Sequence, residues 1–363
     1  MIPASQYQTI YLTLVTIMTL FVYSQYQSRN GLREFAPSRT DAFVSVLVLF
    51  LILFIGFRPV SGRFVDMLNY VLSYEAFFEG ATFVFDWDVE NKIFDNLFAW
   101  WGSEWLGYTS FFVFVAAIYF GAAYLGLRKL FPNHRLAAFL VFLAAFSTFS
   151  YGTNGIKAGA AASLFIFAMG YRENLKVCIP LVLLSWGFHH SMIMVVAGFV
   201  LTLFVKNPKY YLYGWGLCFL LAAAHVTAFA QLFSGFTTEH GAEYLLSEGG
   251  ADGTKGGFRI DFILYSAMPV FVGWYAVFKK RMNLSPLYMD LLNLYVCLNG
   301  TWMLCMYASF TNRIAYLSWF LYPIVLIYPF LQEQWGNTRY KTFGYVMLAH
   351  LGFTLFMKIV YYG

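Results

Sequence analysis

The chain consists largely of long apolar stretches separated by polar connections, most of them short. Twelve stretches can be read, at residues 7–26, 42–60, 108–127, 135–152, 155–171, 174–188, 190–205, 210–231, 260–278, 287–309, 314–331 and 340–360. A helix needs about 20 residues to cross the hydrocarbon core of a bilayer, and its backbone polar groups bond to one another. The sequence therefore predicts an all-α, polytopic integral membrane protein with about 12 transmembrane helices in a single transmembrane domain, residues 1–363.

The composition excludes several other classes of protein. Hydrophobic residues make up 60% of the chain and charged residues 11%, whereas a soluble domain carries about 25% charged residues. A soluble fold of this size could not bury 41 Phe, 27 Tyr and 10 Trp, because too much of its surface stays exposed. A globular cytoplasmic enzyme, a disordered chain and a nucleic-acid-binding protein are thus excluded. No close CxxC pair is present, and the four cysteines predict buried thiols.

The distribution of basic residues predicts the orientation in the membrane. Fifteen of the 23 Lys and Arg residues lie in alternate connections, and the positive-inside rule places these connections in the cytoplasm, with both termini outside. Thirteen of the 18 acidic residues fall on the opposite, outer side. The fifteen inner cations are Arg29, Arg33, Arg39, Arg128, Lys129, Arg135, Arg172, Lys176, Lys206, Lys209, Lys279, Lys280, Arg281, Arg339 and Lys341.

Two connections are long, and both are predicted to be outer loops, at residues 58–107 and 232–259. Within the first, residues 91–105 place apolar side chains at helical spacing, which predicts a short amphipathic helix lying in the membrane interface. The second contains the Gly-rich stretch EGGADGTKGG, which has no apolar periodicity and predicts a loop. This stretch lacks the GKS or GKT ending of a nucleotide-binding P-loop.

Five cations on the predicted outer side stand at the ends of apolar stretches, where their desolvation is costly. Converging from several helices, they would form an anion site, and guanidinium groups suit phosphate because they donate paired hydrogen bonds. Alternatively, each cation contacts lipid headgroups or pairs with Asp66, Glu75 or Asp261. The five cations are Arg58, Arg63, Lys157, Arg259 and Arg313.

Two adjacent histidines, His189 and His190, lie at the outer end of two consecutive apolar stretches. An imidazole can accept a proton from a sugar hydroxyl at neutral pH. Adjacent residues of a helix project in different directions, so at most one of the two takes this role. His240 and Glu243 form a second, weaker acid/base pair in the Gly-rich connection.

The sequence predicts neither a cofactor nor a metal ion. The D-x-D element closest to an outer end of a stretch is Asp86 and Asp88 in FDWDVE, within the long first loop. Metal binding at this pair is the alternative, and it would make arginine less necessary at a leaving group.

Four short motifs resemble the Wzy/EpsG-type polymerases of bacterial cell-surface polysaccharides. An early arginine is followed by a D-x-x-x-Y element, and N-x-(I/V)-R opens a helix rich in small residues, here with lysine in place of arginine. F-H-x-S follows, and then an arginine with a nearby tyrosine opens a late stretch. The matching residues are Arg58, Asp66 and Tyr70; Asn154, Ile156 and Lys157; Phe188, His189 and Ser191; Arg313 and Tyr316.

The resemblance implies a glycosyltransferase of the bacterial inner membrane whose site faces outward. Its substrates would be polyprenyl-diphosphate-linked oligosaccharides, joined by an inverting, metal-independent reaction in contact with membrane lipid, and a partner would regulate chain length. Cations stabilise the leaving diphosphate, and His189 is the expected base. The expected catalytic residues are His189, Arg313 and Arg58, and the expected substrate-binding residues are Arg259, Arg63, Lys157, Asp66, Tyr70, Asn154 and Tyr316.

Three alternatives remain open at this point. An O-antigen-type ligase shares the donor chemistry and differs in its acceptor. A transporter or flippase of lipid-linked oligosaccharides would carry charges near the bilayer midplane and often internal repeats, and the sequence has neither. A membrane O-acyltransferase would favour a site that is open to the cytoplasm.

Overall fold

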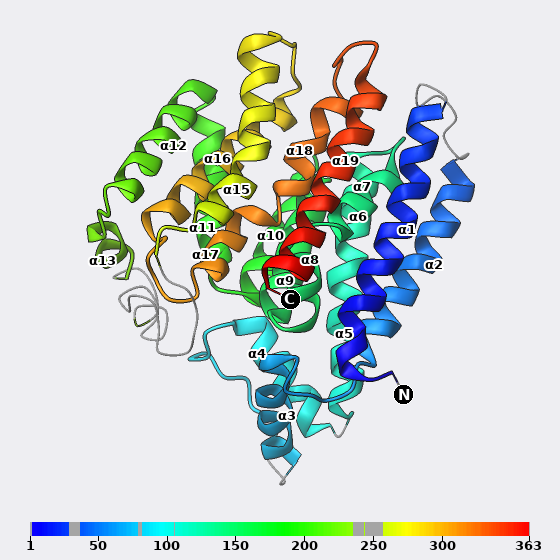
Figure 1. Cartoon of the computed structure of the whole chain (residues 1–363). Helices are drawn as coiled ribbons and strands as arrows, with labels where there is room; N and C mark the ends of the chain where they lie inside the picture. Colours follow the sequence, from blue (N-terminus) through cyan, green and yellow to red (C-terminus); the bar gives the residue numbers. More distant parts are fainter. Residues whose placement is uncertain are drawn as a thin grey trace. The chain divides into compact units, whose positions relative to one another are not determined.

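The computed structural model describes residues 2–28, 37–78, 82–104, 106–234, 243 and 257–362. Within these residues the chain is helical and forms no strand, which confirms the predicted all-α class (Figure 1). Contacts divide the chain into two compact units. Unit 1 comprises Met1–Met192 and Asn337–Gly363, and unit 2 comprises Ile193–Gly336.

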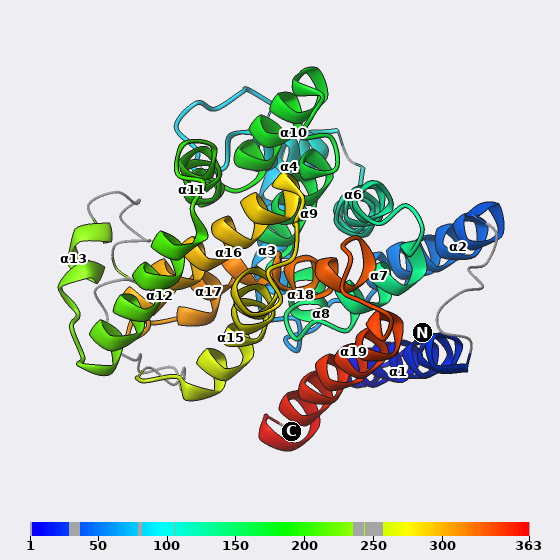
Figure 2. The same cartoon turned by 90° about the horizontal axis from the view of Figure 1, so that it is seen from above.

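Unit 1 contains the N-terminal helices and the last helix of the chain. α1 and α19 lie side by side in both views (Figures 1 and 2). The elements of unit 1 are η1 (Ala4–Gln6), α1 (Tyr7–Ser28), α2 (Pro37–Gly56), α3 (Val65–Phe78), α4 (Lys92–Ser103), α5 (Tyr108–Ala116), the π-helix η2 (Ala117–Ala122), α6 (Ala123–Leu130), α7 (Arg135–Leu143), α8 (Thr148–Thr153), α9 (Ile156–Met169), α10 (Leu175–Phe188), α19 (Arg339–Leu355) and the π-helix η4 (Phe356–Tyr361).

Unit 2 is a second group of helices, in which α12 packs along α16 and α15 packs along α18. Its first helix, α11, begins at the last residue of unit 1. The elements are α11 (Met192–Phe204), α12 (Pro208–Ala223), α13 (Ala228–Ser234), α15 (Ile260–Trp274), the π-helix η3 (Tyr275–Lys279), α16 (Pro286–Leu304), α17 (Thr311–Trp319) and α18 (Tyr322–Leu331).

Five helices of the described chain are long and apolar enough to cross a membrane. Four shorter apolar helices accompany them, and each of the twelve predicted stretches contains at least one helix. The chain is an integral membrane protein, while the number of twelve transmembrane helices stays a prediction. The five candidate spans are Ala4–Gln27, Tyr108–Leu130, Ile260–Lys279, Thr311–Leu331 and Arg339–Tyr361.

Three of the predicted stretches are interrupted. Residues 135–152 form α7 and α8 with a turn between them, residues 210–231 are divided between α12 and α13, and residues 314–331 between α17 and α18. Such breaks are tolerated in an apolar environment only where the freed backbone groups find partners. Tyr11 donates to the carbonyl oxygen of Leu143 and Thr354 donates to that of Ala144, both at 2.7 Å. Side chains of α1 and α19 thus satisfy the end of α7.

The first long connection contains two helices where one was predicted. The predicted amphipathic helix corresponds to α4, whose Phe94 and Phe98 are buried, and its place in a membrane interface stays a prediction. α3 was not predicted, although Met67, Val71 and Tyr74 recur at helical spacing and are buried. His240, Trp105 and most of the Gly-rich stretch lie outside the described residues.

Gly126 of α6 allows a close approach to α9. A Cβ atom added at Gly126 would lie 2.6 Å from the carbonyl oxygen of Ile166, whereas one added at Gly121 would meet nothing within 4 Å. We expect Gly126→Ala to lower the free energy of unfolding by about 1–3 kcal/mol, because the backbone must shift. Gly121→Ala is the matched control, with an unchanged or higher melting temperature. Thermal unfolding in detergent measures both, and equal melting temperatures would contradict this packing.

Candidate functional site

Arg58 follows the end of α2, and it is almost completely buried, at 4% exposed. Its Nη1 donates to the carbonyl oxygen of Ile55 and its Nη2 to that of Thr153, both at 2.9 Å, so the side chain caps α2 and α8. The guanidinium lies over the rings of Phe112 and Phe64, 4.9 and 5.6 Å from their centroids.

The charge of Arg58 has no counter-ion within the described part of the chain. No carboxylate there forms an ion pair with it, and its Nε is buried without a hydrogen-bond partner. Burial lowers the pKa of Arg58 to about 10, so the side chain keeps its charge at neutral pH. A buried cation of this kind is costly unless an anion binds beside it.

Asn154 and Lys157 lie on both sides of the start of α9. The Oδ1 atom of Asn154 is buried and has no hydrogen-bond partner within the described chain. The preceding residue, Thr153, is the one whose carbonyl Arg58 binds. Lys157, in contrast, is paired: its Nζ lies 2.5 Å from Oδ1 of Asp95 in α4. Among the predicted site residues, the buried side-chain atoms without a hydrogen-bond partner in the described chain therefore belong to Arg58 and Asn154.

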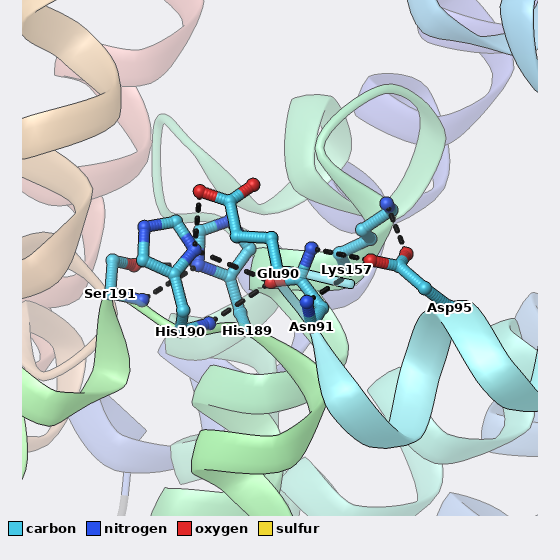
Figure 3. Close-up of polar contacts among 7 residues, drawn as sticks. All are labelled: Glu90, Asn91, Asp95, Lys157, His189, His190 and Ser191. Atoms are coloured by element: carbon cyan, nitrogen blue, oxygen red, sulfur yellow. Dashed lines mark hydrogen bonds and ion pairs between the residues drawn. The ribbon is translucent and has the colours of Figure 1, made fainter. Parts of the chain in front are cut away.

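The segment before α4 binds the turn between α10 and α11 (Figure 3). Asn91 is the N-cap residue of α4, and its backbone and side-chain N–H groups donate to Oδ2 of Asp95, both at 3.1 Å. The Oδ1 atom of Asn91 accepts from the backbone N–H of His190 at 3.0 Å. Nδ1 of His190 lies 3.2 Å from Oε1 of Glu90.

His189 ends α10 in an extended conformation, with φ −150° and ψ 118°. Its Nδ1 accepts from the backbone N–H of Ser191 at 3.3 Å and lies 2.6 Å from the Ser191 hydroxyl oxygen. The rings of His189 and His190 are stacked, with centroids 5.1 Å apart. We call His189 and His190 the histidine pair.

The remaining residues predicted in the first connection have different surroundings. Arg63 is exposed, and its backbone N–H donates to the Ser61 hydroxyl at 3.3 Å. Asp66 is half-buried in the first turn of α3. Tyr70 is also half-buried, and the Lys157 Nζ lies 5.7 Å from its ring centroid. Its ring contacts Phe94, Phe98 and Phe112.

In unit 2, Arg259 is the N-cap residue of α15 and is paired with a carboxylate. Its Nε lies 2.9 Å from Oδ1 of Asp261 and its Nη2 lies 2.6 Å from Oδ2. The guanidinium stacks on Phe262, 3.6 Å from the ring centroid. The alternative that the sequence left open, pairing with Asp261, is confirmed for this arginine.

Arg313 lies in the first turn of α17, and its side chain is exposed. Its guanidinium lies 4.8 Å from the ring centroid of Phe310, and its backbone N–H donates to the Phe310 carbonyl at 2.7 Å. Phe310 has left-handed backbone angles, φ 51° and ψ 34°, which are unfavourable for a bulky residue and cluster at functional sites. Tyr316, one turn later, is buried.

Seven of the ten predicted site residues belong to unit 1, and three, Arg259, Arg313 and Tyr316, belong to unit 2. Contacts in unit 1 link the surroundings of Arg58, Asn154 and Lys157 with those of the histidine pair. The convergence of cations from both units on one anion stays a prediction.

Three residues of this site were not selected from the sequence: Glu90, Asn91 and Asp95. Asn91 before a helix and an acid in its first turn are typical of an N-cap, but their contacts with His190 and Lys157 join distant parts of the chain.

The described residues contain no group of three or more His, Cys, Asp or Glu that could hold a metal ion. In the D-x-D element, Oδ1 of Asp86 accepts from the backbone N–H of Asp88 at 2.8 Å. Metal independence stays a prediction.

No curated protein and no solved structure matches the chain. The model of the EpsG family matches residues 41–362, which include all ten predicted site residues. This match confirms the resemblance seen in the sequence and makes the protein a polymerase-like membrane protein of polysaccharide biosynthesis. The chain belongs to the EpsG family.

Proposed function

We propose that the protein is a polysaccharide polymerase that joins polyprenyl-diphosphate-linked oligosaccharide repeat units at the outer face of the bacterial inner membrane. The observation that carries this proposal is Arg58, a buried guanidinium without a carboxylate partner in the described chain and with an unsatisfied Nε. A lipid diphosphate is an anion with the charge and the oxygen atoms to satisfy it.

The proposed reaction inverts the configuration at the anomeric carbon. A hydroxyl of the new repeat unit attacks this carbon, the bond from the carbon to the diphosphate oxygen breaks, and the hydroxyl proton passes to a base. The products are a lengthened lipid-linked chain and a polyprenyl diphosphate. Negative charge grows on the diphosphate in the transition state, where fixed cations stabilise it.

Arg58 and Arg313 are the proposed cations at the leaving diphosphate, and the buried Oδ1 of Asn154 accepts a hydrogen bond from a sugar hydroxyl. One histidine of the histidine pair accepts the proton of the attacking hydroxyl as a general base. Lys157 and Arg259 are proposed to bind substrate, each exchanging part of its contact with Asp95 or Asp261 for a phosphate oxygen. Further proposed substrate-binding residues are Arg63, Asp66, Tyr70 and Tyr316.

The direct test uses purified protein, lipid-linked repeat units and excess chelator. We expect a ladder of elongated lipid-linked chains, because arginines rather than a metal ion stabilise the diphosphate. Mass spectrometry of the lipid extract identifies the products. Elongation only after Mg²⁺ is restored would contradict metal independence. Transfer to a different lipid acceptor would show a ligase, and movement across vesicles without bond formation would show a flippase.

Arg58 variants test the proposed anion contact. We expect Arg58→Ala to reduce the elongation rate about 10²–10³-fold, the usual effect of removing one transition-state donor. Arg58→Lys should recover only part of the rate, because an ammonium cannot cap both helices and also face a phosphate. The matched control is Lys92→Ala, which removes an exposed cation from the same connection. Equal rates for Arg58→Ala and Lys92→Ala would remove Arg58 from the mechanism.

A double-mutant cycle separates binding by Arg259 from its structural role. Arg259→Ala leaves the carboxylate of Asp261, whose side chain is 13% exposed, without its partner, and should lower the free energy of unfolding by about 1–3 kcal/mol. Arg259→Ala/Asp261→Ala should recover part of this loss, since no charge is left unpaired. If Arg259 binds the donor, elongation by the double variant stays low. Wild-type elongation by the double variant would make the ion pair purely structural.

A further inference from the structure

We propose that His190, held by Glu90, is the base that takes the proton of the attacking hydroxyl, and that His189 donates a hydrogen bond to the substrate. This assignment rests on the proposed function and divides the roles within the histidine pair. The sequence favoured His189 as the base, and the hydrogen bonds of the two rings favour the opposite choice.

The contacts of His190 determine which ring nitrogen carries the hydrogen. Nδ1 lies 3.2 Å from Oε1 of Glu90 and 3.4 Å from Oδ1 of Asn91. The carboxylate oxygen can only accept, and Oδ1 of Asn91 already accepts from the backbone N–H of His190. Nδ1 is therefore the donor, and Nε2 of the neutral ring carries a lone pair. No hydrogen bond within the described chain occupies this lone pair.

His189 has the opposite arrangement. Its Nδ1 accepts from the backbone N–H of Ser191, so that nitrogen has no hydrogen in the neutral ring. The Ser191 hydroxyl, 2.6 Å away, can donate to the same atom. Nε2 of neutral His189 consequently carries the hydrogen and can donate to a sugar or phosphate oxygen. The two neutral rings are therefore opposite tautomers, with an acceptor at Nε2 of His190 and a donor at Nε2 of His189.

The charges around His190 are compatible with a base at neutral pH. Burial lowers the pKa of His190, and the Lys157 ammonium lowers it further, while the carboxylates of Glu90 and Asp95 raise it. The net effect is a lowered pKa of His190, so the ring is neutral before the reaction. His189, on the same turn, is the other titratable group beside it.

Glu90 is a positioning residue in this scheme. It fixes the tautomer by accepting from Nδ1, and its negative charge stabilises the imidazolium that forms when Nε2 receives the proton. After the elongated chain leaves, His190 returns this proton to water. The atoms balance without a metal ion or a second base.

Glutamine variants distinguish the two roles, because glutamine donates a hydrogen bond but cannot accept a proton at neutral pH. We expect His190→Gln to reduce the elongation rate about 10²–10⁴-fold, the usual contribution of a general base. His189→Gln, the matched variant, should lose no more than about tenfold, in line with one retained hydrogen bond. Normal elongation by His190→Gln, with a large loss in His189→Gln, would overturn the assignment.

Glu90→Gln provides a readout that a purely structural contact would not change. The base must be neutral, so the rate falls as the pH drops below the pKa of His190. Removing the carboxylate lowers this pKa, and the acidic limb of the pH–rate profile should shift to lower pH, with a reduced plateau. Glu90→Asp should restore part of both effects. An unshifted limb would leave Glu90 as a structural link between the segment before α4 and α10.

The wild-type protein separates this inference from the proposed function. If wild-type protein does not elongate lipid-linked units, the proposed function fails. If it elongates them and His190→Gln does so equally fast, only the assignment of the base fails. Donor binding and melting temperature, measured for every variant, distinguish lost chemistry from lost folding. If both glutamine variants are unfolded, the acidic limb of the pH–rate profile of Glu90→Gln tests whether His190 is the base.

Discussion

The requirement that every backbone carbonyl find a partner in an apolar environment shapes unit 1. Where a predicted long stretch breaks between α7 and α8, side chains from distant helices bind the carbonyls that the break releases. Arg58 belongs to the same set of contacts, since it binds one carbonyl at the end of α2 and another at the end of α8. At the interrupted helices and at the buried cation alike, a side chain from a distant part of the chain binds carbonyl groups at the end of a helix.

The cations of the candidate site differ in how their charge is balanced. Lys157 and Arg259 each have a carboxylate partner, at 2.5 and 2.6 Å. Among the described residues, Arg58 is held by carbonyl oxygens and aromatic rings and by no carboxylate, so its position is fixed while its charge is not neutralised. The proposed diphosphate site would benefit from such a difference, because paired cations need no substrate to remain stable.

The apolar stretches predicted the helices well, because hydrophobic length in a membrane protein directly reflects the thickness of the bilayer. α4 was predicted from its apolar spacing, and α3 was missed although Met67 and Val71 carry the same signal. The break after Leu143 could not be predicted, since the carbonyl groups that it frees are bound by side chains far away in the sequence. The Glu90–His190 contact spans about a hundred residues and escaped prediction for the same reason.

Asn91 has two structural roles, at the start of α4 and at the backbone of His190. It begins α4, and its side-chain oxygen also fixes the backbone of His190. A rearrangement of the first long connection that displaces this asparagine would therefore also reorient the imidazole of His190, in the turn between α10 and α11. Relatives that adapt this connection to other sugars would have to preserve the asparagine or replace both ends of the contact together. Among such relatives, the range of accepted sugars and the proposed proton transfer at His190 would then change together.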